Sequence, residues 1–359
     1  TTVNALSRRV ASYDMNVVVN GPGTLVLTSS NPNAAPINQG DGASGFITGT
    51  TTVTGGVLSL NSEANIGGNP GVFNPAHLTL SGGTLRARET FAIDDSNRGV
   101  TFGPGGATIE VETNRSLTLA TAVTGAGALN KTGPGALILA GSSTHSGPTT
   151  VTSGGLQVGL LGVGETGTGA LTLAASAFLY GTGTVRADAF TAASGSFIHA
   201  GDGIGSSLFG TLTFEPAAGN GAFDFQSGSS VFLDIALTGE FDQLRFLGTG
   251  LNTLDFFSDL TIGPATLAPT NAMSFKVLDW TDLAFNPDFA AHFSYTNLLF
   301  GNGDESPGLN LPDISGSGFY WDMGGFTSDG VISLVVPEPS RAVLLLFAAA
   351  LIMGRRSRR

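Results

Sequence analysis

Hydrophobic residues alternate with small or polar residues through most of the first two hundred positions. The period of two is clearest at five pairs of leucines separated by one residue, namely Leu25/Leu27, Leu78/Leu80, Leu117/Leu119, Leu137/Leu139 and Leu171/Leu173. This period is typical of β-strands that bury one face. Glycine-rich turns, as at 81–84 and 103–106, separate the strands, and capped helical patterns are almost absent there. The pattern therefore predicts an all-β structure.

Two stretches of the sequence repeat at a distance. Residues 21–27 (GPGTLVL) reappear at 133–139 (GPGALIL), and residues 51–60 reappear at 149–158. The offsets, 133 − 21 = 112 and 149 − 51 = 98, give the first copy 14 additional residues, which we place in the polar segment 29–42 as a surface loop. Short strands with glycine corners favour a β-solenoid whose stacked coils bury an aliphatic core. An antiparallel β-sandwich is the alternative.

The clearer copy, residues 125–159, resembles the autotransporter-associated β-strand repeat. The pattern G-x-G-x-L-x-K-x-G-x-G-x-L-x-L runs from Gly125 to Leu139, and T-x-V-x-x-G-x-L follows from Thr149. Residues 21–60 form a second, interrupted copy. The resemblance implies a right-handed parallel β-helix, as in exported passenger domains. It implies shape and export, and no catalytic residues.

Charge and phenylalanine content divide the chain into three parts. Residues 1–200 carry 10 acidic and 8 basic residues (−2), residues 201–336 carry 16 and 2 (−14), and residues 337–359 carry 1 and 5 (+4), which sum to −12. Phenylalanine rises from 7 residues before position 201 to 16 between 201 and 336. We expect the solenoid over 1–200, and over 201–336 an acidic β-rich region that either continues it or caps its end.

The composition also excludes several classes of protein. The acidic balance argues against nucleic acid as a partner, because binding phosphates requires basic patches. Without cysteine the chain can form neither disulfides nor thiolate metal sites.

The segment 337–359 has three parts in order. Pro337, Glu338 and Pro339 are followed by an uncharged apolar run over 342–353, and a basic end follows, with Arg355, Arg356, Arg358 and Arg359. As a helix the run would span about 18 Å, which is short for a hydrocarbon core of about 30 Å. The arginines would hold one end in the cytoplasm.

This order of parts resembles the PEP-CTERM sorting signal. The resemblance implies that an exosortase, a membrane protease-transpeptidase, is a partner and processes the chain at Pro337-Glu338-Pro339. It also implies a short C-terminal transmembrane sorting helix over 342–353 before processing.

Paired carboxylates were considered as catalytic groups. Asp94 and Asp95 resemble the paired aspartates of pectin-degrading hydrolases, but neighbouring strand residues point to opposite faces, which favours a turn before Ser96. Glu110 and Glu112 would share one strand face, and a solvated surface explains them more simply.

Metal-binding patterns are weak. Four histidines lack ligand spacing, namely His77, His145, His199 and His292. Segments 201–205 and 301–305 offer oxygen ligands for calcium, without the nonapeptide pattern of calcium-binding β-rolls. We therefore expect no catalytic, cofactor or metal site.

Taken together, the sequence predicts a non-enzymatic protein exported to the cell surface or extracellular matrix, structural or adhesive, with exopolysaccharide as a candidate partner. A carbohydrate-active β-helix enzyme (polysaccharide lyase or hydrolase) and an autotransporter-like adhesin are the alternatives.

Overall fold

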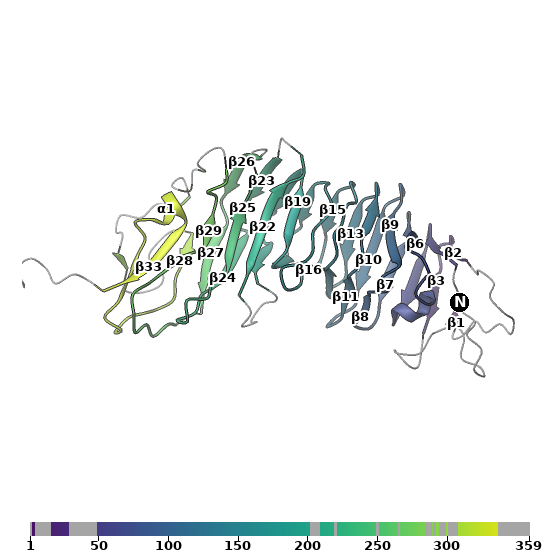
Figure 1. Ribbon diagram of the computed structural model, residues 1–359, viewed down its shortest axis with the longest axis horizontal. Coiled ribbons are helices and arrows are strands. Elements are labelled where there is room, and N and C mark those ends of the chain that lie inside the picture. Colours follow the sequence, from purple (N-terminus) through teal and green to yellow (C-terminus); the bar gives the residue numbers. More distant parts are fainter. Residues whose placement is uncertain are drawn as a thin grey trace, which may run out of the picture.

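The computed structural model is an elongated stack of β-strands that run across its long axis (Figure 1). The N-terminal strands lie at one end of the stack and the last strands at the other. The structure describes residues 2–3, 16–28, 49–201, 209–218, 221–248, 251–264, 266–283, 287, 289, 292–293, 299–300 and 308–336.

From residue 91 on, successive strands visit three faces in a fixed order, whereas the strands before it alternate between two of these faces. One coil consists of β9 (Arg98–Phe102), β10 (Ala107–Val111) and β11 (Ser116–Leu119). The next consists of β12 (Val123–Gly125), β13 (Leu129–Thr132) and β14 (Ala136–Leu139). Each strand pairs in parallel with its counterpart one coil away. This pairing is that of a β-solenoid, in which each coil contacts its neighbours.

The first face is sheet A and the second is sheet C. Sheet A contains β10, β13 and, in stacking order around them, β1 (Thr2–Val3), β3 (Thr24–Leu27), β5 (Val57–Leu60), β7 (Thr84–Ala87), β15 (Thr149–Val151), β17 (Leu171–Leu173), β20 (Ala189–Ala192), β23 (Gly221–Phe225) and β26 (Leu251–Phe256). Sheet C contains β11, β14 and, likewise, β8 (Phe91–Ile93), β16 (Gly154–Val158), β18 (Ala177–Gly181), β21 (Phe197–Ala200), β24 (Ser230–Asp234), β27 (Asp259–Gly263) and β31 (Leu309–Asn310).

The third face consists of two sheets. Sheet B contains β9, β12, β2 (Val17–Val19), β4 (Thr51–Val53) and β6 (Asn74–Leu80). Sheet D contains β19 (Thr184–Ala187), β22 (Thr211–Pro216), β25 (Gln243–Phe246) and β29 (Leu278–Asp279). Between them, single parallel bridges join Val123 to Ser143 and Glu165 to Thr184. On the third face, single bridges therefore replace full strands between sheets B and D.

The core is built from columns of residues in register. Leu117, Leu137, Leu156 and Leu179 pair one above the other on sheet C, and all four are buried. Because the side-chain period is two, this register keeps every coil's apolar set inside. Further along, buried phenylalanines replace much of this aliphatic core, with ring centroids 4.8–6.3 Å apart among Phe190, Phe214, Phe223, Phe225, Phe246 and Phe256. The Phe-rich composition after residue 200 thus largely reflects the core.

The parallel coils continue beyond residue 200 and end under an antiparallel sheet. β20 pairs with β23, and β21 with β24, so stacking passes through this point. The last sheet contains β28 (Met273–Lys276), β30 (Leu299–Phe300), β32 (Tyr320–Asp322) and β33 (Val331–Val335). The helix α1 (Phe326–Asp329) lies between β32 and β33 in the chain. It lies at the far end of the stack (Figure 1). The first part of residues 201–336 therefore continues the solenoid, and the last part caps its end.

The two sequence repeats fold alike and occupy different faces. In the first copy β2 and β3 lie on sheets B and A, whereas in the second β13 and β14 lie on sheets A and C. The corner is the same, because Gly56 (φ 65°) and Gly154 (φ 73°) are equivalent in the repeat and both left-handed. A side chain at Gly154 would also collide with the carbonyl oxygen of Gly133.

Several expectations fall outside the described residues. These are the loop at 29–42, the motif Pro337-Glu338-Pro339, the apolar run 342–353 and the four terminal arginines. In the portion of the chain that the structure describes, no helix has the length and apolar character that a membrane crossing requires.

Candidate functional site

The carboxylates considered from the sequence have separate surroundings. Glu110 points outward from sheet A and forms an ion pair with Arg86 of the preceding coil (Nε–Oε2 2.9 Å), and Glu112 is exposed. Asp94 and Asp95 lie between β8 and a turn, and the turn is at 96–97, slightly later than the position expected before Ser96. They also converge with Glu63, so that one carboxylate oxygen of each lies within 4.8 Å of the others.

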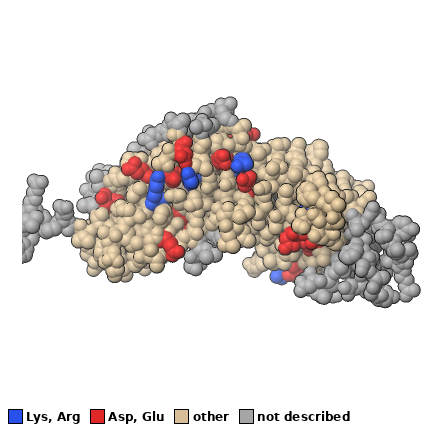
Figure 2. Space-filling model, viewed as in Figure 1, with Lys and Arg blue, Asp and Glu red and all other residues tan. Residues whose placement is uncertain are grey.

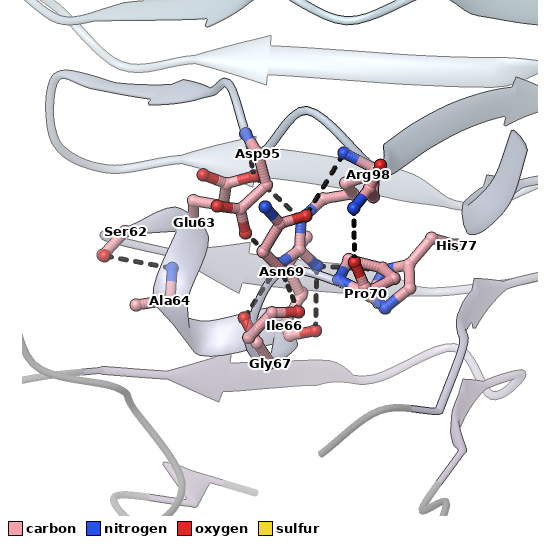
Figure 3. A network of polar contacts seen from close by, with 12 residues as sticks. Ser62, Glu63, Ala64, Ile66, Gly67, Asn69, Pro70, His77, Asp95 and Arg98 are labelled. Atoms are coloured by element: carbon pink, nitrogen blue, oxygen red, sulfur yellow. Dashed lines mark hydrogen bonds and ion pairs between the residues drawn. The ribbon is translucent and has the colours of Figure 1, made fainter. Parts of the chain in front are cut away.

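This convergence belongs to a network around Arg98, which we name the Arg98 cluster (Glu63, His77, Asp94, Asp95 and Arg98). Figure 3 shows Glu63, His77 and Asp95 around Arg98. The cluster lies where the coil before β8 has a 3₁₀ helix, η1 (Glu63–Ile66), between its sheet A and sheet B strands. The Arg98 guanidinium is fully buried and donates to Glu63 Oε1 (2.8 Å) and Asp95 Oδ2 (2.6 Å). It also donates to three carbonyl oxygens, at 3.1, 2.8 and 3.0 Å, of Ile66, Gly67 and Gly68.

The Arg98 cluster already has a cation from the chain, the guanidinium that pairs with Glu63 and Asp95. A guanidinium only donates, so His77 Nδ1, 2.9 Å from Arg98 Nη1, accepts and the imidazole is neutral. Burial, together with Arg98, lowers the pKa of His77 to about 4. Burial raises the pKa of Glu63 to about 7, although Arg98 opposes the rise. The cluster therefore holds the helix η1 against the next coil, with Arg98 where a metal ion would sit.

A second cluster lies on the outer side of sheet C, and we name it the His199 cluster (His199, Asp234 and Asp242). His199 Nε2 lies 3.2 Å from Asp234 Oδ2 and 3.9 Å from Asp242 Oδ2. The Asp242 carboxylate is buried and accepts from the backbone amides of Gly210 (2.9 Å) and Asp234 (3.0 Å). Burial raises the pKa of Asp242 to about 6, against the lowering by these amides. No pattern in the sequence predicts that these residues meet.

A cavity of about 360 Å³ lies beside the His199 cluster. Its walls include Phe178, Phe197 and Phe232, with His199 and Asp234 as polar members. The Phe178 and Phe197 rings stack with centroids 4.9 Å apart and planes within 15°, and the Phe197 and Phe232 centroids are 6.2 Å apart. We name this cavity the aromatic pocket. Its volume is in the range of small-ligand sites, about 300–1,000 Å³, and it has their mixture of apolar walls and few polar groups.

The aromatic pocket can bind a ligand more readily than it can hydrolyse one. Both mechanisms of glycoside hydrolysis need two working carboxyl groups. Here Asp242 is 1% exposed and both of its oxygens accept backbone N–H groups. Asp234, whose side chain is 33% exposed, is the one carboxylate of the cluster that a ligand can reach. The geometry favours recognition through aromatic walls and one carboxylate.

The remaining candidates have structural surroundings. His145 Nε2 lies 3.0 Å from Thr149 Oγ1, and burial lowers the pKa of His145 to about 4. His292 Nε2 donates to the Ser258 carbonyl oxygen (3.0 Å). Of the two segments considered for calcium, residues 202–205 and 301–305 lie outside the described residues.

Fold and site together define a parallel β-solenoid with a ligand-sized aromatic pocket on its outer surface. Residues 17–60 and 129–158 match the passenger-associated-transport-repeat family, which confirms the resemblance of both copies to autotransporter-associated repeats. The chain is also 35% identical over 142 residues to the adhesin BmaC autotransporter of Brucella suis biovar 1 (strain 1330), which covers 39% of this chain. The matched segment spans 4% of that adhesin's length. No solved structure matches the chain.

Proposed function

We propose that this chain is a non-enzymatic protein of the cell surface or extracellular matrix, with a structural or adhesive role. The observation that supports this most is the position of the passenger-type repeats, which both lie within one continuous parallel stack, separated by the coils that contain β7 and β10. The similarity to an adhesin supports the same role.

The physical basis of the role is the shape of the solenoid. Stacked coils give an elongated body whose outer faces are long, regular surfaces, as binding surfaces of repeat proteins are. The face seen in Figure 2 is mostly uncharged, and its acidic and basic side chains gather in small groups. Such a body can extend from a cell and display a binding face at a distance from it.

Sorting by the terminal segment is part of the proposal. Its sequence supports recognition of Pro337-Glu338-Pro339 by an exosortase, with residues 342–353 in the membrane until processing and the terminal arginines in the cytoplasm. Exopolysaccharide, which surrounds cells that use this route, is the proposed partner of the mature protein.

The test is expression of the full chain in a Gram-negative host that encodes an exosortase, followed by mass spectrometry of the mature C-terminus. Replacing Pro337-Glu338-Pro339 by three alanines should leave uncleaved, membrane-retained protein, whereas the control E112A/E240A, at two exposed carboxylates, should mature normally. Mature protein should also increase the retention of exopolysaccharide by cells. Normal maturation of the triple-alanine variant contradicts the sorting mechanism, and unchanged retention contradicts the adhesive role.

A further inference from the structure

The carboxylates of the His199 cluster have no lysine or arginine as an ion-pair partner among the described residues. Residues 201–336 contain only two basic residues, and both are engaged elsewhere. Arg245 Nη2 lies 2.7 Å from Asp282 Oδ2, and Lys276 Nζ lies 2.7 Å from Asp279 Oδ1. Among the described residues, His199 is the one ion-pair partner of Asp234 and Asp242. The cluster therefore leaves room for a positive charge that the chain does not supply.

The surroundings of Asp234 distinguish between an inorganic and an organic cation. A histidine that binds a metal almost always donates its other ring nitrogen to a fixed acceptor, but His199 Nδ1 is buried and has no hydrogen-bond partner in the described structure. Both oxygens of Asp242 are already taken by backbone amides. A pocket of about 360 Å³ is also far larger than a metal ion needs. These features disfavour a metal site.

The aromatic walls favour an organic cation. Cations are attracted to aromatic rings within about 6 Å of the ring centroid, and the C–H groups of the ligand pack on the ring surfaces. Phe178, Phe197 and Phe232 provide these rings beside the reachable carboxylate of Asp234. A hydrogen bond between an ammonium group and a carboxylate is charge-assisted and roughly twice as strong as a neutral one.

We infer that the aromatic pocket binds a primary ammonium group carried on a small ring, as in an amino sugar, with the ammonium at Asp234 and the ring on Phe178, Phe197 and Phe232. The inference does not depend on the proposed adhesive function, since it concerns the ligand of one pocket. Polysaccharides that carry free amino groups would present this chemistry at the surface of the solenoid.

The experiment is ligand-detected NMR and calorimetry on the full chain, with glucosamine and N-acetylglucosamine as probes. Glucosamine should bind at least tenfold more tightly, because acetylation removes the charge that Asp234 recognises. Asp234→Asn should reduce glucosamine affinity at least tenfold. Thr261→Lys, which places a competing ammonium group on the pocket wall, should do the same without altering the cluster.

The control is Thr172→Lys, which adds the same charge on the outer side of sheet A. Its glucosamine affinity should stay within twofold of the wild type, and circular dichroism should show that all variants remain folded. Equal affinity for the two probes overturns the inference, as does unchanged glucosamine binding in both D234N and T261K. Zn²⁺ alone binding at Asp234 and displacing glucosamine would identify a metal site instead. Each outcome is separate from processing at Pro337-Glu338-Pro339 and from retention of exopolysaccharide.

Discussion

The Arg98 cluster and the His199 cluster contain similar residues and differ in whether an arginine pairs with the carboxylates. Each contains a buried histidine and several carboxylates. Carboxylate oxygens of Glu63, Asp94 and Asp95 lie within 4.8 Å of one another in the first cluster, and a ring nitrogen of His199 and oxygens of Asp234 and Asp242 do so in the second. In the first, the Arg98 guanidinium lies among them and makes hydrogen bonds to side chains and backbone (Figure 3). In the second, no lysine or arginine among the described residues forms an ion pair with the carboxylates. A cluster whose cation comes from the chain is therefore structural, whereas a cluster without one can take a cationic ligand.

The position of each cluster in the stack explains the difference. η1 replaces a strand, so its carbonyl groups have no neighbouring strand to bond, and the fixed donors of Arg98 take that role. In contrast, β21 and β24 are in full register around the His199 cluster, where the ladder already satisfies the backbone. His199 and Asp234 line the aromatic pocket, whereas the buried Asp242 accepts the backbone N–H groups of Gly210 and Asp234.

The largest expected effect comes from removing the cation of the Arg98 cluster. Arg98→Met leaves Glu63, Asp95 and three carbonyl groups without their donor, and breaking a buried pair costs about 3–5 kcal/mol. We expect a lower urea midpoint and faster hydrogen exchange over 62–70. The control Arg115→Met removes an exposed pair with Glu89 and should cost less than about 1 kcal/mol. Equal losses in the two variants would contradict the structural role of Arg98.

Glu63 should make stability fall as pH rises. Its pKa is raised from 4.5 to about 7 in the folded chain, so its contribution is complete below pH 4.5 and is lost as pH rises through 7. The shift corresponds to at most about 3 kcal/mol. Glu63→Gln should flatten this part of the stability profile, measured as urea midpoints at pH 4.5, 6 and 8. A profile parallel to the wild type would show that Glu63 stays ionised beside Arg98.

His77 should make stability fall as pH decreases, which is opposite to the effect of Glu63, and the change in stability should be similar or smaller. Its pKa is lowered from 6.5 to about 4, so its contribution is complete above pH 6.5 and is lost as pH falls through 4. His77→Gln should reduce the acid sensitivity of unfolding between pH 6.5 and 4 by at most about 3 kcal/mol. His145→Gln is the matched comparison, since burial lowers the pKa of His145 similarly in another coil. If H77Q leaves acid sensitivity unchanged, folding does not lower the pKa of His77.

The smallest effect is expected from the His199 cluster itself. Asp242→Asn removes a buried charge, which stabilises the folded chain, and one of two amide acceptors, which costs about 1–3 kcal/mol. We expect a net change below about 1 kcal/mol at pH 7, measured by the urea midpoint. A loss as large as that of R98M would mean that the His199 cluster holds a cation of structural importance, and the contrast between the clusters would fail.

Much of the fold could be predicted from local patterns. The alternation at Leu117/Leu119 and Leu137/Leu139 identifies β11 and β14, and both leucine pairs are buried as that alternation requires. The repeat predicts the glycine corner, because Gly56 and Gly154 both adopt a positive φ that glycine permits. The acidic region could be separated by composition, but whether it continued or capped the stack depended on long-range pairing.

The candidate site could be predicted only in fragments. Phe178, Phe197 and Phe232 occupy outward positions next to buried residues, and this is a local signal that a period-two reading could have found. That these rings and Asp234 line one pocket depends on which residues stack between coils, and the coils differ in length. The partners of Arg98 are equally dispersed, since Glu63 precedes it by 35 residues.

The strands, their buried faces, the corner glycines and the partition of charge follow from neighbours along the chain, and local sequence patterns therefore predict them. Long-range packing places the two repeats on different pairs of faces, brings Arg98 to the carbonyl groups that lack ladder bonds, and brings His199 to Asp234 and Asp242 beside the aromatic pocket. The physical reason is the register between coils, which is set by packing the whole column of side chains and not by any one segment.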